Sequence, residues 1–198
     1  LDGQSKVTRL VDKAIADGMK GMAITDHGVM FGIKEFSDYC AKVNKERKKN
    51  GEEPFKPIFG CEMYVARRTM HDKDKSMHDN SGYHLIVLAK NYNGYKNLIK
   101  LVSHAWVDGY YYRPRTDRAE LEKYHEDLIV CSACIAGEIP SKIIHGDIDG
   151  AREACEWYHR VFGDDFYLEL QRHEVKDPTI LANREAFPLQ QKANKLLL

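Results

Sequence analysis

Apolar and polar positions along the chain follow a pattern that predicts strands interleaved with helices. Helical spacing of apolar residues predicts helices at residues 5–15, 31–43, 91–106, 117–124, 148–162 and 183–198. Short apolar runs predict strands at residues 22–25, 56–65, 84–89, 128–131 and 166–170. Strands that alternate with helices favour a parallel sheet, either open and doubly wound or closed into a barrel.

The stretch at residues 67–81 is polar and charged, without periodicity, and it predicts a surface loop or a mobile lid. The His and Lys residues within it, between His71 and His78, are interpreted as solvated surface because their spacing is irregular. No Pro/Gly/Ser-rich linker and no internal repeat divides the chain. We therefore expect residues 1–198 to belong to one domain.

Composition narrows the class of protein. Lys plus Arg and Asp plus Glu number 30 each, so any contact with nucleic acid must be local. Five cysteines at irregular spacing argue against a disulfide framework and favour a cytoplasmic location. No run reaches the ~20 apolar residues of a membrane helix, so no membrane contact is expected. The chain opens without Met and stops within an apolar helical run, as expected of a fragment.

Two strands deliver polar groups that could carry chemistry. Asp26 and His27 directly follow the strand at residues 22–25, where functional side chains gather in parallel folds, although such a pair can also cap a helix. Glu62 lies within the apolar strand at residues 56–65. A buried carboxylate there must be paired or bound to a cation, whereas strand alternation also allows it to face solvent.

Further candidate ligands are His84 and Cys134. His84 offers an imidazole of the kind that zinc and manganese bind, but it begins its strand, whereas barrel sites gather at the carboxyl ends of strands. Cys131 continues an apolar strand and is expected in the core, and Cys134 lies beyond the strand end, where a thiolate can reach a metal. No second CxxC pair accompanies them, so a zinc finger is not predicted.

The loop at residues 109–115 combines three tyrosines with two arginines. Such a loop suits stacking on nucleic-acid bases and contact of Arg113 and Arg115 with phosphate. Packing of the tyrosines beneath the loop is the alternative interpretation, and the sequence leaves both open.

Taken together, several phrases resemble the PHP domain of bacterial replicative DNA polymerase III alpha subunits. They are Leu1-Asp2-Gly3, Ala23-Ile24-Thr25-Asp26-His27-Gly28, Lys56-Pro57-Ile58-Phe59-Gly60-Cys61-Glu62, His84-Leu85-Ile86-Val87-Leu88-Ala89-Lys90-Asn91 and Ser132-Ala133-Cys134-Ile135-Ala136-Gly137-Glu138. The resemblance runs nearly from end to end, and Tyr111-Tyr112-Arg113-Pro114-Arg115 also looks like that family.

The resemblance implies a distorted (β/α)7 TIM-like barrel whose first and last strands are missing or incomplete here. It implies a rim that binds up to three divalent ions, Zn, Mn or Mg. By position, the implied ligands are Asp2, His27, Glu62, His84 and Cys134. Of these, His27, Glu62 and His84 are the implied catalytic residues.

The resemblance also implies a function. The parent protein would be a DNA-directed DNA polymerase, a nucleotidyltransferase that binds DNA and other replicase subunits, among them a separate proofreading exonuclease. The domain itself would either hydrolyse phosphodiesters as a metal-dependent 3′→5′ exonuclease or serve as a scaffold. A stand-alone PHP phosphoesterase of the histidinol-phosphatase type is the alternative.

Overall fold

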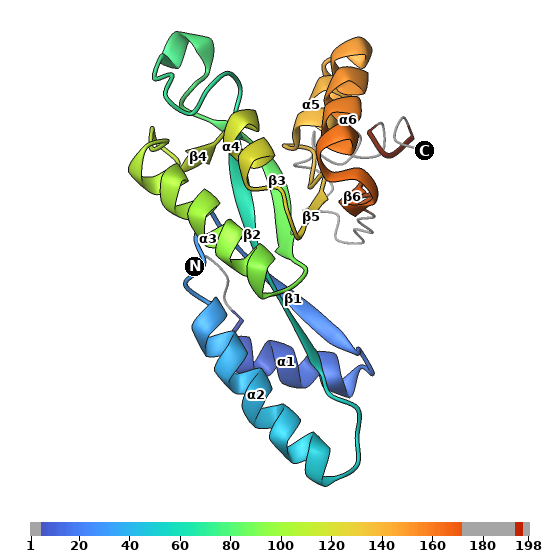
Figure 1. Ribbon diagram of the computed structural model, residues 1–198. Helices are drawn as coiled ribbons and strands as arrows, with labels where there is room; N and C mark the ends of the chain where they lie inside the picture. Colours follow the sequence, from blue (N-terminus) through green and yellow to red (C-terminus); the bar gives the residue numbers. More distant parts are fainter. Residues whose placement is uncertain (1–4, 172–192, 196–198) are drawn as a thin grey trace, which may run out of the picture.

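The computed structural model describes residues 5–171 and 193–195 of the 198-residue chain (Figure 1). Its α-helices are α1 (Val7–Ala16), α2 (Ile33–Lys49), α3 (Tyr92–Val107), α4 (Arg118–Lys123), α5 (Glu138–Ile144) and α6 (Ile148–Phe162). Its strands are β1 (Gly21–His27), β2 (Lys56–Ala66), β3 (Gly82–Ala89), β4 (Arg115–Thr116), β5 (Leu128–Cys131) and β6 (Phe166–Tyr167). Two 3-10 turns, η1 (Lys75–Met77) and η2 (Gly163–Asp165), complete the described elements.

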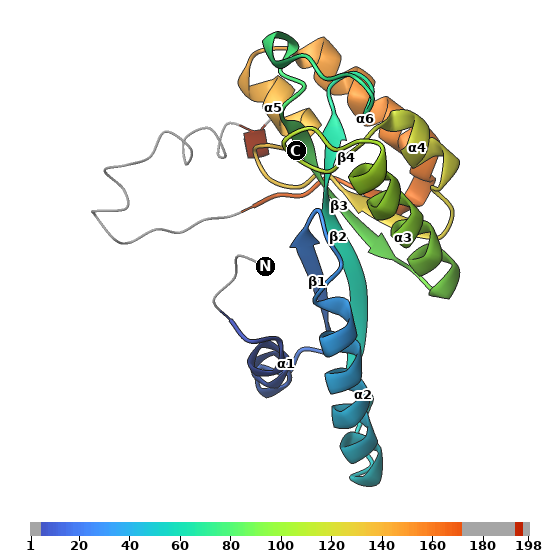
Figure 2. The ribbon, with the colours of Figure 1, turned by 90° about the vertical axis from the view of Figure 1, so that its left-hand side faces the viewer.

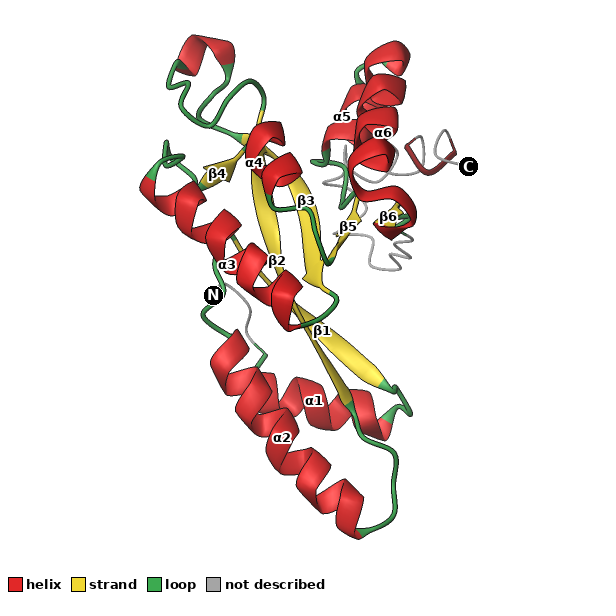
Figure 3. Ribbon diagram, viewed as in Figure 1, coloured by secondary structure: helices red, strands yellow, loops and turns green. Residues whose placement is uncertain are grey.

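The strands form one mixed sheet in the order β1-β2-β3-β5-β6, with β4 paired to β2 (Figure 3). β1 and β2 run parallel, as do β5 and β6, but β3 is antiparallel to both β2 and β5. Within the described residues the sheet is open and does not close into a barrel. The alternation of helices and strands is therefore confirmed, whereas the expectation of a parallel sheet is wrong for β3.

The connection between β2 and β3 explains this reversal. A return in the parallel direction needs a crossover of a dozen or more residues, usually a covering helix. Residues 67–81 contain only the short turn η1 (Lys75–Met77) and no covering helix, so the chain comes back alongside β2 in the antiparallel direction. Residues 67–81 show no helical periodicity in the sequence, in keeping with the absence of a covering helix between these strands.

The larger hydrophobic core lies between the sheet and the helices that follow β2. Alternate residues Cys61, Met63 and Val65 of β2 are buried in it with residues of α3, α4, α5 and α6. Figure 2 shows α3, α4 and α6 on one side of β2 and β3. Because neighbouring strand residues point to opposite faces, Glu62 and Tyr64 lie on the other face of the sheet.

A second, smaller core joins α1, α2 and the beginning of the sheet. Val11 and Ala14 of α1 are buried against Phe36 and Cys40 of α2, with Phe55 beside them. The same apolar spacing that predicted these two helices therefore also supplies the residues that fix them together. Strand β1 packs on this core through Met22 and Ile24 and ends at His27.

Some elements differ from those expected. Helix α5 (Glu138–Ile144) was not predicted, because about two turns containing Pro140 give too little periodicity. The proline is tolerated in the first turn, where its missing N–H has no partner. The strand expected at residues 166–170 is limited to β6. The helix expected at residues 183–198 lies outside the described residues except for 193–195, which are helical.

No helix in the described part of the chain is both long and apolar enough to cross a bilayer.

Candidate metal site

The strand registers bring three of the predicted ligands to one face of the sheet. His27 is paired with Glu62 across the parallel strands β1 and β2. Across the antiparallel pair, Glu62 lies opposite Ile86 and Tyr64 lies opposite His84. Opposite residues share a face, and so do residues two apart, so His84 projects from the same face as Glu62.

The carboxylate of Glu62 lies between two imidazoles. Its Oε1 is 2.7 Å from Nδ1 of His84, and its Oε2 is 3.4 Å from Nε2 of His27. The Glu62 side chain is 17 % exposed, that of His84 28 % and that of His27 47 %. Of the two interpretations of Glu62, the structure therefore supports the paired carboxylate, in a partly buried position.

Cys134 approaches the same group from the segment that follows β5. Its Sγ lies 3.6 Å from Nδ1 of His84. The backbone fixes this approach, because the amide of His84 donates to the carbonyl of Ala136 at 3.0 Å and the amide of Gly137 donates to the carbonyl of Cys134 at 2.8 Å. Ala133, with a φ of 59°, adopts the left-handed conformation that turns the chain back toward β3.

These contacts shift the pKa values of two of the groups. Hydrogen bonds to Cys134 and Glu62 raise the pKa of His84 to about 9. The bond to His84 in turn lowers the pKa of the Cys134 thiol, which favours the thiolate. Without a metal, these shifts favour a protonated His84 beside Glu62 and Cys134. A bound cation would release the proton from His84.

Other predicted positions behave differently. Asp26 accepts a hydrogen bond from the amide of Gly32 at 2.9 Å, so its carboxylate satisfies a local backbone donor just before α2. Asp2 lies outside the described residues. Cys131 is partly exposed and paired with Ile86 in the register, so it lies on the same face as Glu62 and not in the helix-covered core.

The donor set fits a divalent transition metal in kind, with imidazole, carboxylate and thiolate ligands. Within residues 5–171 and 193–195, however, no three His, Cys, Asp or Glu side chains form a group that could hold a metal ion as they stand. Two ligands about 2.0 Å from one tetrahedral ion stand about 3.3 Å apart, whereas Glu62 and His84 are in direct hydrogen-bond contact at 2.7 Å. An ion would have to separate them by roughly half an ångström.

Sequence reasoning missed Tyr64, which borders the site. Its ring meets that of His84 edge to face, with centroids 5.3 Å apart, and the guanidinium of Arg113 lies 5.5 Å from its centroid. Tyr64 follows Glu62 by two residues in the same strand and so shares its face. That two-residue spacing was the available signal.

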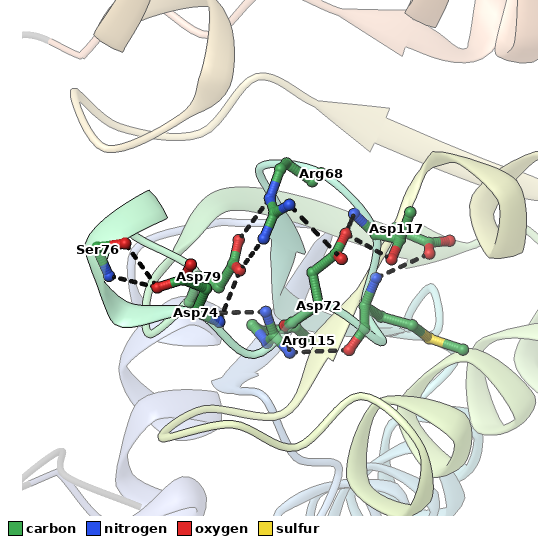
Figure 4. A network of polar contacts seen from close by, with 9 residues as sticks. Arg68, Asp72, Asp74, Ser76, Asp79, Arg115 and Asp117 are labelled. Atoms are coloured by element: carbon green, nitrogen blue, oxygen red, sulfur yellow. Dashed lines mark hydrogen bonds and ion pairs between the residues drawn. The ribbon is translucent and has the colours of Figure 1, made fainter.

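The loop at residues 67–81 is ordered by a buried arginine (Figure 4). Arg115 is fully buried, and its guanidinium donates to the carbonyl oxygens of Gly109, Asp79, Met70 and Asp72 at 2.8–3.0 Å. Arg68 forms an ion pair with Asp79, which is itself buried. Arg115 therefore holds the loop together and presents no group to phosphate, which leaves Arg113 as the exposed arginine of this segment.

Comparisons with known proteins agree with one another. The model of the family described as PHP domain matches residues 1–173. DNA polymerase III subunit alpha of Borreliella burgdorferi is 46 % identical over 184 residues, which cover 93 % of this chain and 15 % of the relative. The Treponema pallidum protein of the same name is 40 % identical over 89 % of this chain and 14 % of its own length. That of Aquifex aeolicus is 37 % identical over 100 % and 16 % respectively. The chain thus spans about one seventh of the length of these relatives.

Proposed function

This chain belongs to the PHP domain family, and from that premise we propose that His27, Glu62, His84 and Cys134 bind divalent metal for phosphodiester hydrolysis. The observation that carries the proposal is the position of the Glu62 carboxylate between His27 and His84. Zn, Mn or Mg suits such ligands, and up to three ions are proposed for the complete site. Asp2 is proposed as a further ligand.

Each residue has a distinct role in this proposal. Glu62 supplies the negative charge that draws cations to a half-buried position, where the surrounding protein strengthens its field. His27, the most exposed of the three, is the ligand nearest to incoming substrate. His84 and Cys134 close the inner side of the site. A bound divalent ion supplies an acidic water and stabilises charge on the phosphoryl oxygens.

The setting is proposed from the relatives. We place this domain in a DNA-directed DNA polymerase of the alpha-subunit type, acting in the cytoplasm on DNA with other replicase subunits, among them a separate proofreading exonuclease. The similarity of the chain to alpha subunits over 89–100 % of its length supports this over a stand-alone phosphoesterase. In the complete protein, the open sheet is proposed to close into the (β/α)7 barrel of the family.

Two functions remain distinct within this setting, a 3′→5′ exonuclease and a scaffold for other subunits. The convergence of four ligand-type side chains favours the exonuclease, since a scaffold has no need of a carboxylate held between two imidazoles. We propose the exonuclease as the principal function of the site.

The test is metal content followed by activity, in the complete protein. Elemental analysis after dialysis against Mn²⁺ or Zn²⁺ is expected to find bound metal in the wild type and about tenfold weaker binding in Glu62→Gln. Glu53→Gln, at an exposed carboxylate before β2, is the matched control and should bind as the wild type does. Equal metal content in all three proteins would refute the site.

The second arm separates exonuclease from scaffold. Digestion of a primer 3′ end with Mn²⁺ should be rapid for the wild type and for Glu53→Gln, and should fall to the background for Glu62→Gln. Metal binding without digestion above that of Glu62→Gln would refute the exonuclease and favour the scaffold.

A further inference from the structure

Three exposed aromatic side chains lie within seven residues of the chain, where α3 ends and the next loop begins. Trp106, Tyr110 and Tyr112 are 44 %, 47 % and 60 % exposed. The rings of Trp106 and Tyr110 are stacked, with centroids 5.4 Å apart and an angle of 20° between their planes. Both rings are thus partly accessible to a flat group from solvent.

The structure holds these rings in place. Nε1 of Trp106 donates to the carbonyl of Gly28 at 2.8 Å, so the indole is anchored to the residue that follows His27. Tyr112 has a φ of 61°, a conformation that costs an aromatic residue about 1–2 kcal/mol relative to glycine. Its neighbours fix it there, since the amide of Tyr111 donates to the carbonyl of Arg113 at 3.0 Å. Such backbone strain is concentrated at functional sites, which makes this exposed tyrosine a candidate contact.

The aromatic surface adjoins the site directly. The amide of Gly28 donates to the carbonyl of Glu62 at 2.8 Å, and a Cβ at Gly28 would meet Pro114 and Tyr64. Arg113 extends the surface toward the ligands, because its guanidinium lies by the ring of Tyr64, which in turn contacts His84. A ligand on the rings therefore also meets a cation on its way to Glu62.

The kind of ligand follows from these groups. Flat faces beside a guanidinium suit nucleobases joined by phosphates. In a duplex the bases are already stacked and their faces are hidden, so only a single strand can use the rings. The balanced charge of the chain, with 30 basic and 30 acidic residues, also favours stacking over a broad electrostatic groove.

We propose that Trp106, Tyr110 and Tyr112, together with Arg113, form a stacking platform that binds the last nucleotides of a single-stranded nucleic acid. This inference rests on the proposed function, since it leads the strand end to the metal ligands. The rings bind the bases and Arg113 binds a phosphate between them.

The test uses the 198-residue chain kept free of metal with EDTA, so the measurement does not depend on hydrolysis. Trp106 reports binding, because stacking on a base quenches indole fluorescence and Trp157, the other tryptophan of the 198-residue chain, is buried. A short oligothymidylate should quench the signal and bind about fivefold or more tightly than an abasic sugar-phosphate of equal length. Equal binding of the two ligands, or no quenching by either, would overturn the proposal.

Variants provide a second measurement. Tyr110→Leu combined with Tyr112→Gly removes two rings, and the glycine relieves the backbone conformation, so the fold should persist. This variant should lose most of the preference for the base-bearing strand, and Arg113→Gln should weaken both ligands alike. Tyr92→Leu, a 73 % exposed tyrosine at the opposite end of α3, is the control. A preference that survives the double variant, or that is equally lost in Tyr92→Leu, would contradict the platform.

The two proposals fail separately. Loss of the base preference in the double variant, with no metal bound by the wild type, would refute the metal site and retain the platform. Metal binding that depends on Glu62, with no preference for the base-bearing strand, would refute the platform and retain the metal site.

Discussion

His84 lies directly opposite Tyr64 across the antiparallel strands β2 and β3. This pairing resolves an apparent conflict, since His84 begins its strand whereas functional groups were expected at the carboxyl ends of strands. Because β3 runs against β2, its beginning lies beside the end of β2 and near the end of β1, where His27 stands. The reversal of β3 therefore brings His84 to the end of the sheet where His27 and Glu62 lie.

The thiol chemistry of the site gives a first prediction. In metal-free protein, Cys134 should react fastest with iodoacetamide, because its contact with His84 lowers the pKa of its thiol, whereas burial raises the pKa of Cys61 to about 12. Mass spectrometry of labelled peptides measures the rates. Added Zn²⁺ should protect Cys134 and leave the rate at Cys155, a partly exposed thiol on α6, unchanged. Equal protection of both thiols would speak against ligation by Cys134.

The buried guanidinium gives a second prediction. Arg115→Met should lower the free energy of unfolding by about 3–5 kcal/mol, because four carbonyl oxygens lose their donor at once. Arg115→Lys should recover little of this free energy of unfolding, since an ammonium group cannot reproduce the planar set of guanidinium N–H donors. Urea unfolding measures both. The neighbouring Arg113→Met, at an exposed side chain, should change stability by less than about 0.5 kcal/mol, and an equal loss in the two would argue against this role of Arg115.

How far the sequence could lead differs between the fold and the site. The helices at α1, α3 and α6 and the strands at β2, β3 and β5 follow from apolar periodicity, which depends on neighbours along the chain. The direction of β3 and the role of Arg115 depend on partners far along the chain, such as Arg115 with Met70. No local pattern records such a contact, so the sequence offered Arg115 only as a candidate phosphate contact in an aromatic loop.

For the site itself, the sequence indicated which residue types could bind a metal, but it did not indicate how they are arranged in space. His27, Glu62, His84 and Cys134 were singled out individually and lie together. Tyr64 looked like one more apolar strand residue. Its place beside His84 needed the register, which the sequence does not reveal.

The loop at residues 67–81 should loosen at acid pH. The ion pair with Arg68 holds the pKa of Asp79 below its usual value, so this pairing stabilises the protein above the ordinary carboxyl pKa of about 3.9 and is lost as pH falls through the lower folded value. Amide hydrogen exchange of residues 67–81 between pH 5 and pH 3, corrected for intrinsic rates, should show protection falling with pH. In Asp79→Asn the protection should be low throughout and independent of pH. A wild-type loop equally protected at both pH values would contradict this account.

Gly28 links the platform to the site, and its substitution tests that link. Its φ is 66°, and a Cβ would come within 2.7 Å of Cγ of Pro114 and 3.1 Å of the Tyr64 ring. Gly28→Ala should therefore cost about 2–4 kcal/mol, the sum of left-handed strain and overpacking. Gly51→Ala is a matched control, because Gly51 has a φ of 73° with open space around its Cβ position, so only the strain of about 1–2 kcal/mol applies. Urea unfolding gives the two free energies.

The same pair separates local from global effects. In Gly28→Ala, movement of Pro114 and Tyr64 should disturb both His27 and Trp106, so metal affinity and quenching by oligothymidylate should fall together. Gly51→Ala should lose stability alone, since Gly51 lies in the connection between α2 and β2 with open space around its Cβ position. If Gly28→Ala were destabilised no more than Gly51→Ala and bound metal normally, the close contact of Pro114 and Tyr64 with Gly28 would not constrain the site.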